Sequence, residues 1–240
     1  MDLTTKSGFA EIHPTYRCNL SCVGCNRMCF LKPSVPDMTI DDMREFLRQA
    51  KELHWSPIIR MVGGEPTLHA NFMEFLELAQ EFTGSRERVQ IWSNAHGKRV
   101  NEILDESQRR GLGCIMEHTK KPMGTIIHGI RDFCIAPADY GEDRQACGLH
   151  SSHISCGICV DSQGYALCPC GGAIAGYLDK KFMTKTLADL FNQTTAETQT
   201  KAMCRWCGAH TSEKHKRKTE KLCGIAMSPS WIEAAKKYGA

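Results

Sequence analysis

Segments typical of strands and segments typical of helices alternate along the first half of the chain. Short apolar runs recur, and each is followed by a stretch whose apolar residues repeat every three or four positions. This alternation predicts parallel strands joined by helices, which is an α/β fold. The predicted strands cover residues 7–13, 57–62, 88–93 and 113–117, and the predicted helices cover residues 39–53, 71–82 and 98–110.

Capping signals mark the ends of these helices. Thr39 precedes the first helix, and Asp42 stands where it can complete a capping box. Asn71 precedes the second helix, with Glu74 three residues later. Gly111 follows the third helix and is a typical residue at a helix end.

The β/α array is predicted to be incomplete. Only seven residues separate the fourth strand from the next apolar segment at 125–133, which leaves no room for a helix. A length of 240 residues also excludes a complete eight-unit barrel. We therefore predict a truncated parallel β/α barrel over residues 1–140. A small module over residues 141–240 would contain a β-hairpin at 158–167 and a short helix at 186–191.

Composition narrows the class of protein. The formal net charge is +3, which is too small to indicate a nucleic-acid or membrane partner. The chain has no apolar run of about 18 residues, and its first residues lack the basic and apolar regions of a signal peptide. We therefore expect a cytoplasmic protein.

The chain has 14 cysteines. A reducing cytosol disfavours structural disulfides, so closely spaced cysteines predict metal ligands. The cysteines form three groups, at 18/22/25/29, 147/156/159/168/170 and 204/207, with Cys114, Cys134 and Cys223 isolated. An isolated cysteine is most simply a small buried apolar residue.

The first group has the spacing Cys18-x3-Cys22-x2-Cys25, in the loop after the first predicted strand. Three thiolates can hold a [4Fe–4S] cluster and leave one iron without a protein ligand. The alternative is a structural zinc site, which needs a fourth ligand such as Cys29 or a histidine.

The stretch "CNLSCVGC" resembles the CxxxCxxC signature of the radical S-adenosylmethionine (radical SAM) superfamily. Gly63-Gly64-Glu65-Pro66 after the second strand resembles the family's "GGEP" motif, and Ser93-Asn94 in "IWSNAHG" resembles its third motif. The resemblance covers roughly residues 8–118. Gly24 departs from the family pattern, which has an aromatic residue before the third cysteine. Taken alone, "GGEP" is a strand-ending turn, and Ser93 and Asn94 are loop-capping residues.

The resemblance implies a reaction type. A reduced cluster held by Cys18, Cys22 and Cys25 would cleave SAM to methionine and a 5′-deoxyadenosyl radical, which removes a hydrogen atom from the substrate. Gly63 and Gly64 would allow close approach to SAM, and the Glu65 carboxylate would balance an ammonium group. Cys29 is expected to point away from the cluster.

The second group resembles the twitch and SPASM-type extensions of some radical SAM enzymes. Two cysteines flank the predicted hairpin, and a Cys-x2-Cys pair follows. A second [4Fe–4S] cluster is therefore predicted on Cys156, Cys168, Cys204 and Cys207. Cys147, Cys159 and Cys170 compete for these positions, and a four-cysteine zinc site is the alternative.

We therefore expect a radical SAM enzyme of the oxidoreductase type, which carries out a net oxidation or a rearrangement. The expected substrate is a small polar metabolite of the sugar or aminocyclitol type, because only a few residues precede the first strand and leave no peptide-binding domain. The electron donor would be reduced flavodoxin or ferredoxin. The alternatives are a peptide-modifying maturase, which forms thioethers or epimerises residues, and a non-catalytic zinc or iron–sulfur module. The sequence assigns no catalytic side chain.

Overall fold

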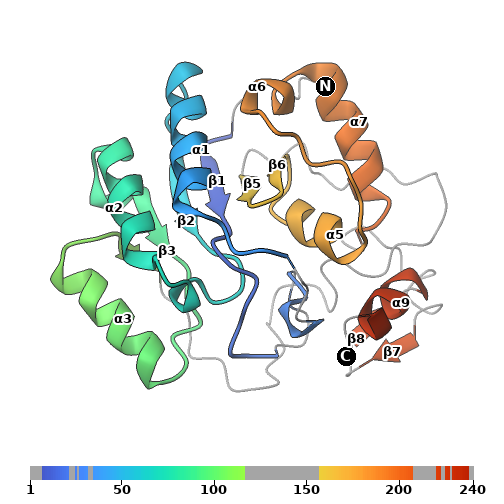
Figure 1. The fold of residues 1–240 in the computed structure, drawn as a ribbon, viewed down its shortest axis with the longest axis horizontal. Coiled ribbons are helices and arrows are strands. Elements are labelled where there is room, and N and C mark those ends of the chain that lie inside the picture. The colour runs from blue at the N-terminus through green and yellow to red at the C-terminus, as the bar shows by residue number, and fades with distance from the viewer. Residues whose placement is uncertain are drawn as a thin grey trace.

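A computed structural model describes residues 7–21, 25, 27–31, 35–116, 157–207, 220–222, 225–227 and 229–237 (Figure 1). Its main sheet has six strands in the order β4-β3-β2-β1-β5-β6. The strands are β1 (Phe9–Ile12), β2 (Ile58–Met61), β3 (Val89–Ile91), β4 (Cys114–Ile115), β5 (Ile158–Asp161) and β6 (Gly164–Ala166). All neighbouring pairs are parallel except β5 and β6.

Among the described strands, β4 and β6 are the edges of the sheet, so it does not close into a barrel. The predicted truncated β/α barrel is therefore confirmed. The predicted hairpin is also present, but its first strand, β5, pairs in parallel with β1 and continues the main sheet. The predicted boundary at residue 140 lies outside the described residues, and the division into two parts stays a prediction.

Three helices cover one face of the sheet: α1 (Ile40–Glu52), α2 (Phe72–Thr83) and α3 (Lys98–Arg109). Thr39 and Asp42 form the predicted capping box. Asn71 precedes α2, but its side chain makes no capping hydrogen bond. Buried apolar residues of the strands and helices form the main core, among them Ile12, Met61, Phe46 and Phe75.

Three further helices lie beside β5 and β6 (Figure 1): α5 (Gly171–Tyr177), α6 (Leu187–Leu190) and α7 (Gln193–Cys204). A two-stranded sheet of β7 (Glu220–Leu222) and β8 (Ile225–Met227) precedes α9 (Pro229–Lys237). Single 3-10 turns lie at Cys29–Leu31, Pro66–Leu68 and Arg86–Arg88. No helix in the described part of the chain is long and apolar enough to cross a membrane.

The second face of the sheet is polar. Strand residues point alternately to the two faces, and one set, including Ile12 and Ile59, packs into the main core. The other set places Glu11, Arg60 and Gln90 side by side across β1, β2 and β3. Arg60 Nε donates to Gln90 Oε1 at 3.1 Å, and Arg60 Nη1 lies 3.8 Å from Glu11 Oε1. Parallel sheets are usually apolar on both faces, so this polar row indicates a binding surface.

Candidate functional site

The predicted cofactor-binding residues lie in three loops that follow β1, β2 and β3. Since parallel strands end at the same edge of a sheet, the three loops are neighbours there. Gly64 N donates to Thr15 O at 2.9 Å, and Glu65 N donates to Arg17 O at 2.8 Å. Asn94 Nδ2 lies 3.7 Å from Cys18 Sγ. The structure thus brings the first cysteine loop, the glycine turn and the Ser93–Asn94 loop into direct contact.

Gly63 and Gly64 are needed for the packing of these loops. Gly63 has φ +96°, and a Cβ there would lie 2.5 Å from Thr15 O. A Cβ on Gly64 would lie 2.1 Å from Arg17 O. Both positions therefore require glycine because the cysteine loop passes directly against them.

Glu65 joins the second and third loops. Its side chain is completely buried. The carboxylate accepts hydrogen bonds from Thr67 N (3.2 Å) and Thr67 Oγ1 (2.7 Å), and also from Ser93 Oγ (2.9 Å) and Asn94 N (2.8 Å). Among the described residues the carboxylate faces protein donors, and the expectation that it balances a ligand's ammonium group stays a prediction. Its role is to position the loops.

We expect Glu65→Gln to lower the free energy of unfolding by about 1 to 3 kcal/mol. The side-chain amide nitrogen of the new glutamine would face donors such as Asn94 N–H. These donors would lose the oxygen that accepts their hydrogen bonds. Thermal unfolding measures the change. The control is Glu74→Gln, because Glu74 pairs with Arg44 on the exposed surface and should cost less than about 1 kcal/mol. Equal losses in the two variants would contradict the positioning role.

Cys25 and Cys29 lie in contact in the first group. A hydrogen bond from Cys29 lowers the pKa of the Cys25 thiol to about 6, although burial opposes this shift. The same contact and burial raise the pKa of Cys29. Cys29 is thus buried against Cys25, and the expectation that it points away from the cluster stays a prediction. Cys22 lies outside the described residues.

Four half-buried cysteines of the later groups pack against one small apolar core, which includes Met203, Ile174 and the buried Cys159. They are Cys168, Cys170, Cys204 and Cys207. A hydrogen bond joins the thiols of Cys168 and Cys170, and Cys207 is close enough to affect the ionisation of Cys168. Cys147 and Cys156 lie outside the described residues. The structure therefore brings together three of the four predicted ligands, with Cys170 beside them.

The sequence profile of the radical SAM superfamily matches residues 12–114. These residues are a radical SAM domain. A 7,8-dihydro-6-hydroxymethylpterin dimethyltransferase of Methanocaldococcus jannaschii is 32% identical over 107 residues. That match covers 44% of this chain and 21% of the relative, so the chain spans about a fifth of the relative's length.

The fold is similar to that of BtrN, a solved structure. BtrN in complex with AdoMet and 2-DOIA superposes with a TM-score of 0.55 at 15% identity, covering 95% of this chain and 100% of that chain. BtrN in an open conformation gives a TM-score of 0.53 at 14% identity, covering 97% and 99%. At such identity the likeness shows a shared fold.

Radical SAM domains carry a [4Fe–4S] cluster and SAM, and the donor set of this chain fits such a cluster. Cys18 and Cys25 are half-buried thiols in the loop that carries the family motif. The environment of Cys25 favours the thiolate that ligates iron, because a hydrogen bond from Cys29 lowers its pKa.

Arg27 is a site residue that the sequence analysis missed. Its buried guanidinium pairs with Glu11, and its charge lowers the pKa of both Cys25 and Cys170. Its Nε has no hydrogen-bond partner among the described residues. The only local signal is its position two residues after Cys25, so the sequence does not show that it reaches the second cysteine group.

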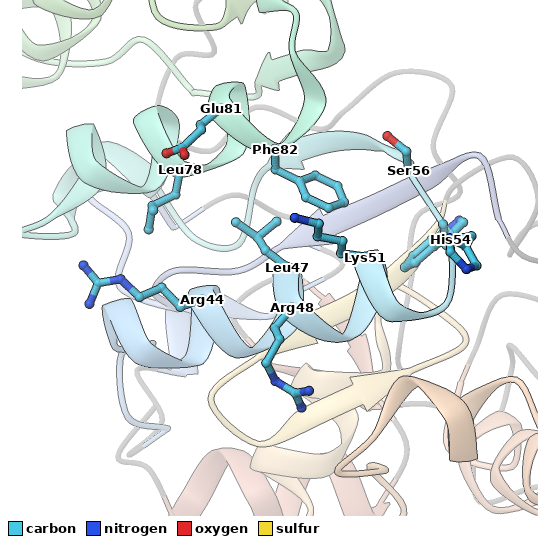
Figure 2. Close-up of a pocket in the computed structure, with 10 residues that line it drawn as sticks. Arg44, Leu47, Arg48, Lys51, His54, Ser56, Leu78, Glu81 and Phe82 are labelled. Atoms are coloured by element: carbon cyan, nitrogen blue, oxygen red, sulfur yellow. The ribbon is translucent and has the colours of Figure 1, made fainter.

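A groove of about 750 Å³ lies between α1 and α2, away from this site (Figure 2). Its lining includes His54 and Ser56, which lie before the start of β2, whereas Gly63–Pro66 follow the end of that strand. Its arginines, Arg44 and Arg48, are paired with acidic residues. We assign no function to this groove.

Proposed function

We propose that the chain is a radical SAM enzyme that oxidises a small polar metabolite and holds a second iron–sulfur cluster. When bound, SAM and the first cluster supply a radical that removes a hydrogen atom from the substrate. The second cluster supplies an acceptor for a second electron. The substrate would lose one hydrogen atom, then one electron and one proton, which is a net two-electron oxidation. The observation that carries the proposal is the polar row of Glu11, Arg60 and Gln90 on the inner face of the sheet.

Some residues of the site hold the first cluster and SAM, and others bind the substrate. Cys18, Cys22 and Cys25 hold the first cluster, and the contacts of Gly64, Glu65 and Asn94 fix the loops around it. Backbone atoms of these loops, together with Pro66 and Ser93, bind SAM. The polar row then orients the hydroxyl or amino groups of a sugar or aminocyclitol, because it offers both donors and acceptors.

The second cluster is assigned to cysteines near the end of β6 and α7. Cys168, Cys204 and Cys207 are three ligands, and the fourth is Cys170 or Cys156. The contact between Cys168 and Cys170 favours Cys170. Reduced flavodoxin or ferredoxin would serve as the electron donor, as expected for the family.

The test is anaerobic reconstitution followed by iron and sulfide analysis, then incubation with dithionite and SAM. We expect about eight irons per chain and formation of 5′-deoxyadenosine. Cys168→Ser should lose about four irons and keep SAM cleavage, whereas Cys114→Ser on β4 should change neither.

Substrate class is tested by adding sugars, aminocyclitols and cysteine-containing peptides separately. The proposal requires a sugar or aminocyclitol product that lacks two hydrogen atoms. A methylated product would instead match the name of the Methanocaldococcus relative, and a modified peptide would support a maturase. Either result would reject the proposed oxidation.

A further inference from the structure

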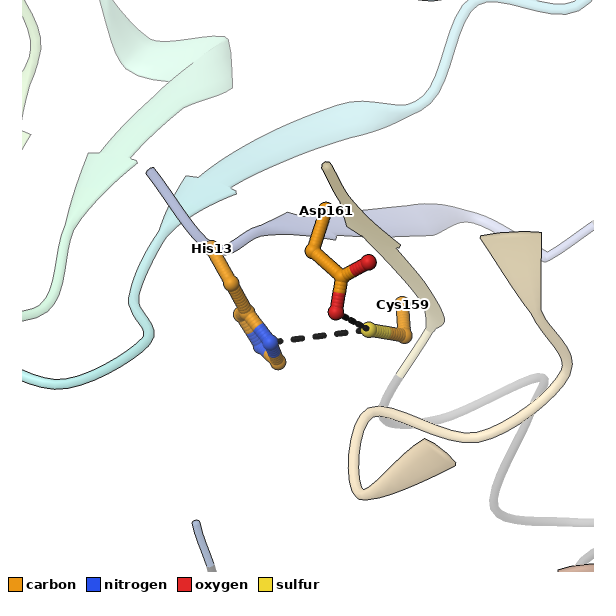
Figure 3. A group of neighbouring side chains, drawn as sticks. All are labelled: His13, Cys159 and Asp161. Carbon is orange, nitrogen blue, oxygen red and sulfur yellow. Dashed lines mark hydrogen bonds between the residues drawn. The ribbon is translucent and has the colours of Figure 1, made fainter. Parts of the chain in front are cut away.

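His13, Cys159 and Asp161 form a buried cluster of side chains (Figure 3). His13 directly follows β1, and the other two residues belong to β5, which pairs with β1 in parallel. Cys159 Sγ lies 3.5 Å from His13 Nδ1 and 3.8 Å from Asp161 Oδ2. The register of β1 with β5 therefore brings an imidazole, a thiol and a carboxylate together.

We propose that these three side chains bind one zinc ion through His13 Nδ1, Cys159 Sγ and a carboxylate oxygen of Asp161. Zinc prefers nitrogen, sulfur and oxygen ligands in a tetrahedron, and its bond lengths place neighbouring ligand atoms about 3.3 to 3.7 Å apart. Tyr16 Oη lies 3.2 Å from His13 Nδ1 and 2.7 Å from Asp161 Oδ2. The 2.7 Å contact is a hydrogen bond from the phenol to the carboxylate, so Tyr16 orients Asp161, whereas the two distances from Cys159 Sγ lie close to the range that one zinc ion requires.

Groups around the cluster orient the proposed ligands. A histidine ligand usually donates its other ring N–H to a carboxylate, and His13 Nε2 lies 3.7 Å from Glu11 Oε2. Glu11 is in turn paired with Arg27. Arg27 Nη2 also lies 3.4 Å from His13 Nε2, so Glu11 and Arg27 together hold the ring with Nδ1 facing Cys159.

The carboxylate is held in the same way. Gln163 N donates to Asp161 Oδ1 at 2.8 Å, and Gln163 Nε2 donates to Oδ2 at 3.1 Å. Oδ2 is also approached by Tyr16 Oη and Cys159 Sγ, which makes three neighbours for an oxygen with two lone pairs. A cation shared by the oxygen and the sulfur relieves this crowding.

Charge supports a divalent ion. Cys159 and Asp161 are both almost completely buried, and the Cys159 thiol donates toward the carboxylate. Zinc would displace the thiol proton and would then face two negative charges, a thiolate and a carboxylate, without solvent. One zinc ion neutralises both. Gly172 brings backbone against the cluster, since a Cβ there would lie 1.9 Å from Asp161 Oδ2 and 2.3 Å from Tyr16 Oη. The site would tie β5 to β1 and hold the hairpin against the radical SAM domain.

The experiment measures zinc in protein whose clusters have first been filled with iron, so that the cluster cysteines are occupied. Zinc is added, excess is removed with a chelator, and zinc and iron are counted by mass spectrometry. We expect about one zinc per chain in the unmodified protein and in the control Cys114→Ser. Cys159→Ser and Asp161→Asn should each lower zinc at least about tenfold without changing iron.

Three results would overturn the zinc site. They are absence of zinc in the unmodified protein, unchanged zinc in both variants, and a fall in iron on replacing Cys159, which would make that residue a cluster ligand. If neither variant folds, the site is tested by anomalous diffraction at the zinc edge from crystals of the unmodified protein. A peak between His13 Nδ1 and Cys159 Sγ supports the site, and no peak there rejects it. None of these measurements depends on SAM cleavage or on the substrate.

Discussion

Replacing Cys25 with serine should remove the cluster that binds SAM and lower the yield of 5′-deoxyadenosine at least about a hundredfold. Cys25 is the proposed ligand whose ionisation the protein most clearly favours, because Cys29 donates a hydrogen bond to its sulfur. A serine hydroxyl does not ionise at neutral pH and is a poor ligand for a soft iron–sulfur cluster. Anaerobic iron analysis and a SAM cleavage assay measure the loss.

Cys29→Ser is the matched control, because it changes a cysteine in contact with Cys25 by the same single atom. The serine hydroxyl can still donate toward the Cys25 sulfur, so we expect iron content to be kept and SAM cleavage to stay within about tenfold of the unmodified protein. A SAM-binding cluster needs one iron without a protein ligand. Equal losses of iron in both variants would show that Cys29 is a ligand, and SAM chelation at this cluster would then be rejected.

Elements with strong local signals were predicted closely from the sequence. The first helix was predicted over 39–53 and is found at Ile40–Glu52, since its apolar face and its capping box are both visible locally. The hairpin at 158–167 was also predicted. Its pairing with β1 was not, because parallel pairing between strands far apart in the chain leaves no local pattern.

The helix α7 was missed because its buried face is partly polar. Gln199 and Thr200 are buried together with Ala196 and Met203. The Gln199 side chain accepts a hydrogen bond from Leu167 N at 2.8 Å and donates one to Tyr165 O at 3.0 Å. These hydrogen bonds to the backbone of other segments hold the helix in place. A search for apolar periodicity does not find such a helix.

The sequence motifs identified residues of the candidate site, but they did not show how the side chains are oriented. Sequence motifs named Cys18, Glu65 and Asn94, and the structure places all three in adjoining loops. The orientation of the Glu65 carboxylate and the contacts of Arg27 depend on how β1, β2 and β3 pair in the sheet. That pairing is set by tertiary packing. The His13, Cys159 and Asp161 cluster depends on the β1–β5 register in the same way.

The glycine turn allows a second prediction with a large effect. In Gly64→Ala, the new Cβ would lie 2.1 Å from Arg17 O, 2.7 Å from Arg17 C and 2.8 Å from Tyr16 C. These are backbone atoms, so no side-chain rotation relieves the overlap, and the cysteine loop must move. The hydrogen bonds from Gly64 N to Thr15 O and from Glu65 N to Arg17 O would then break.

We expect Gly64→Ala to lower the free energy of unfolding by about 1 to 3 kcal/mol, because overpacking displaces backbone. SAM cleavage should fall further, by about a hundredfold, since a displacement of roughly 1 Å at a reacting site has effects of that size. Gly8→Ala is the control, because nothing lies within 4 Å of a Cβ at Gly8. Thermal unfolding, iron content and 5′-deoxyadenosine yield separate the two effects. Retention of full activity by Gly64→Ala would show that the cysteine loop does not need this close contact, and the structural role given to the glycine turn would be wrong.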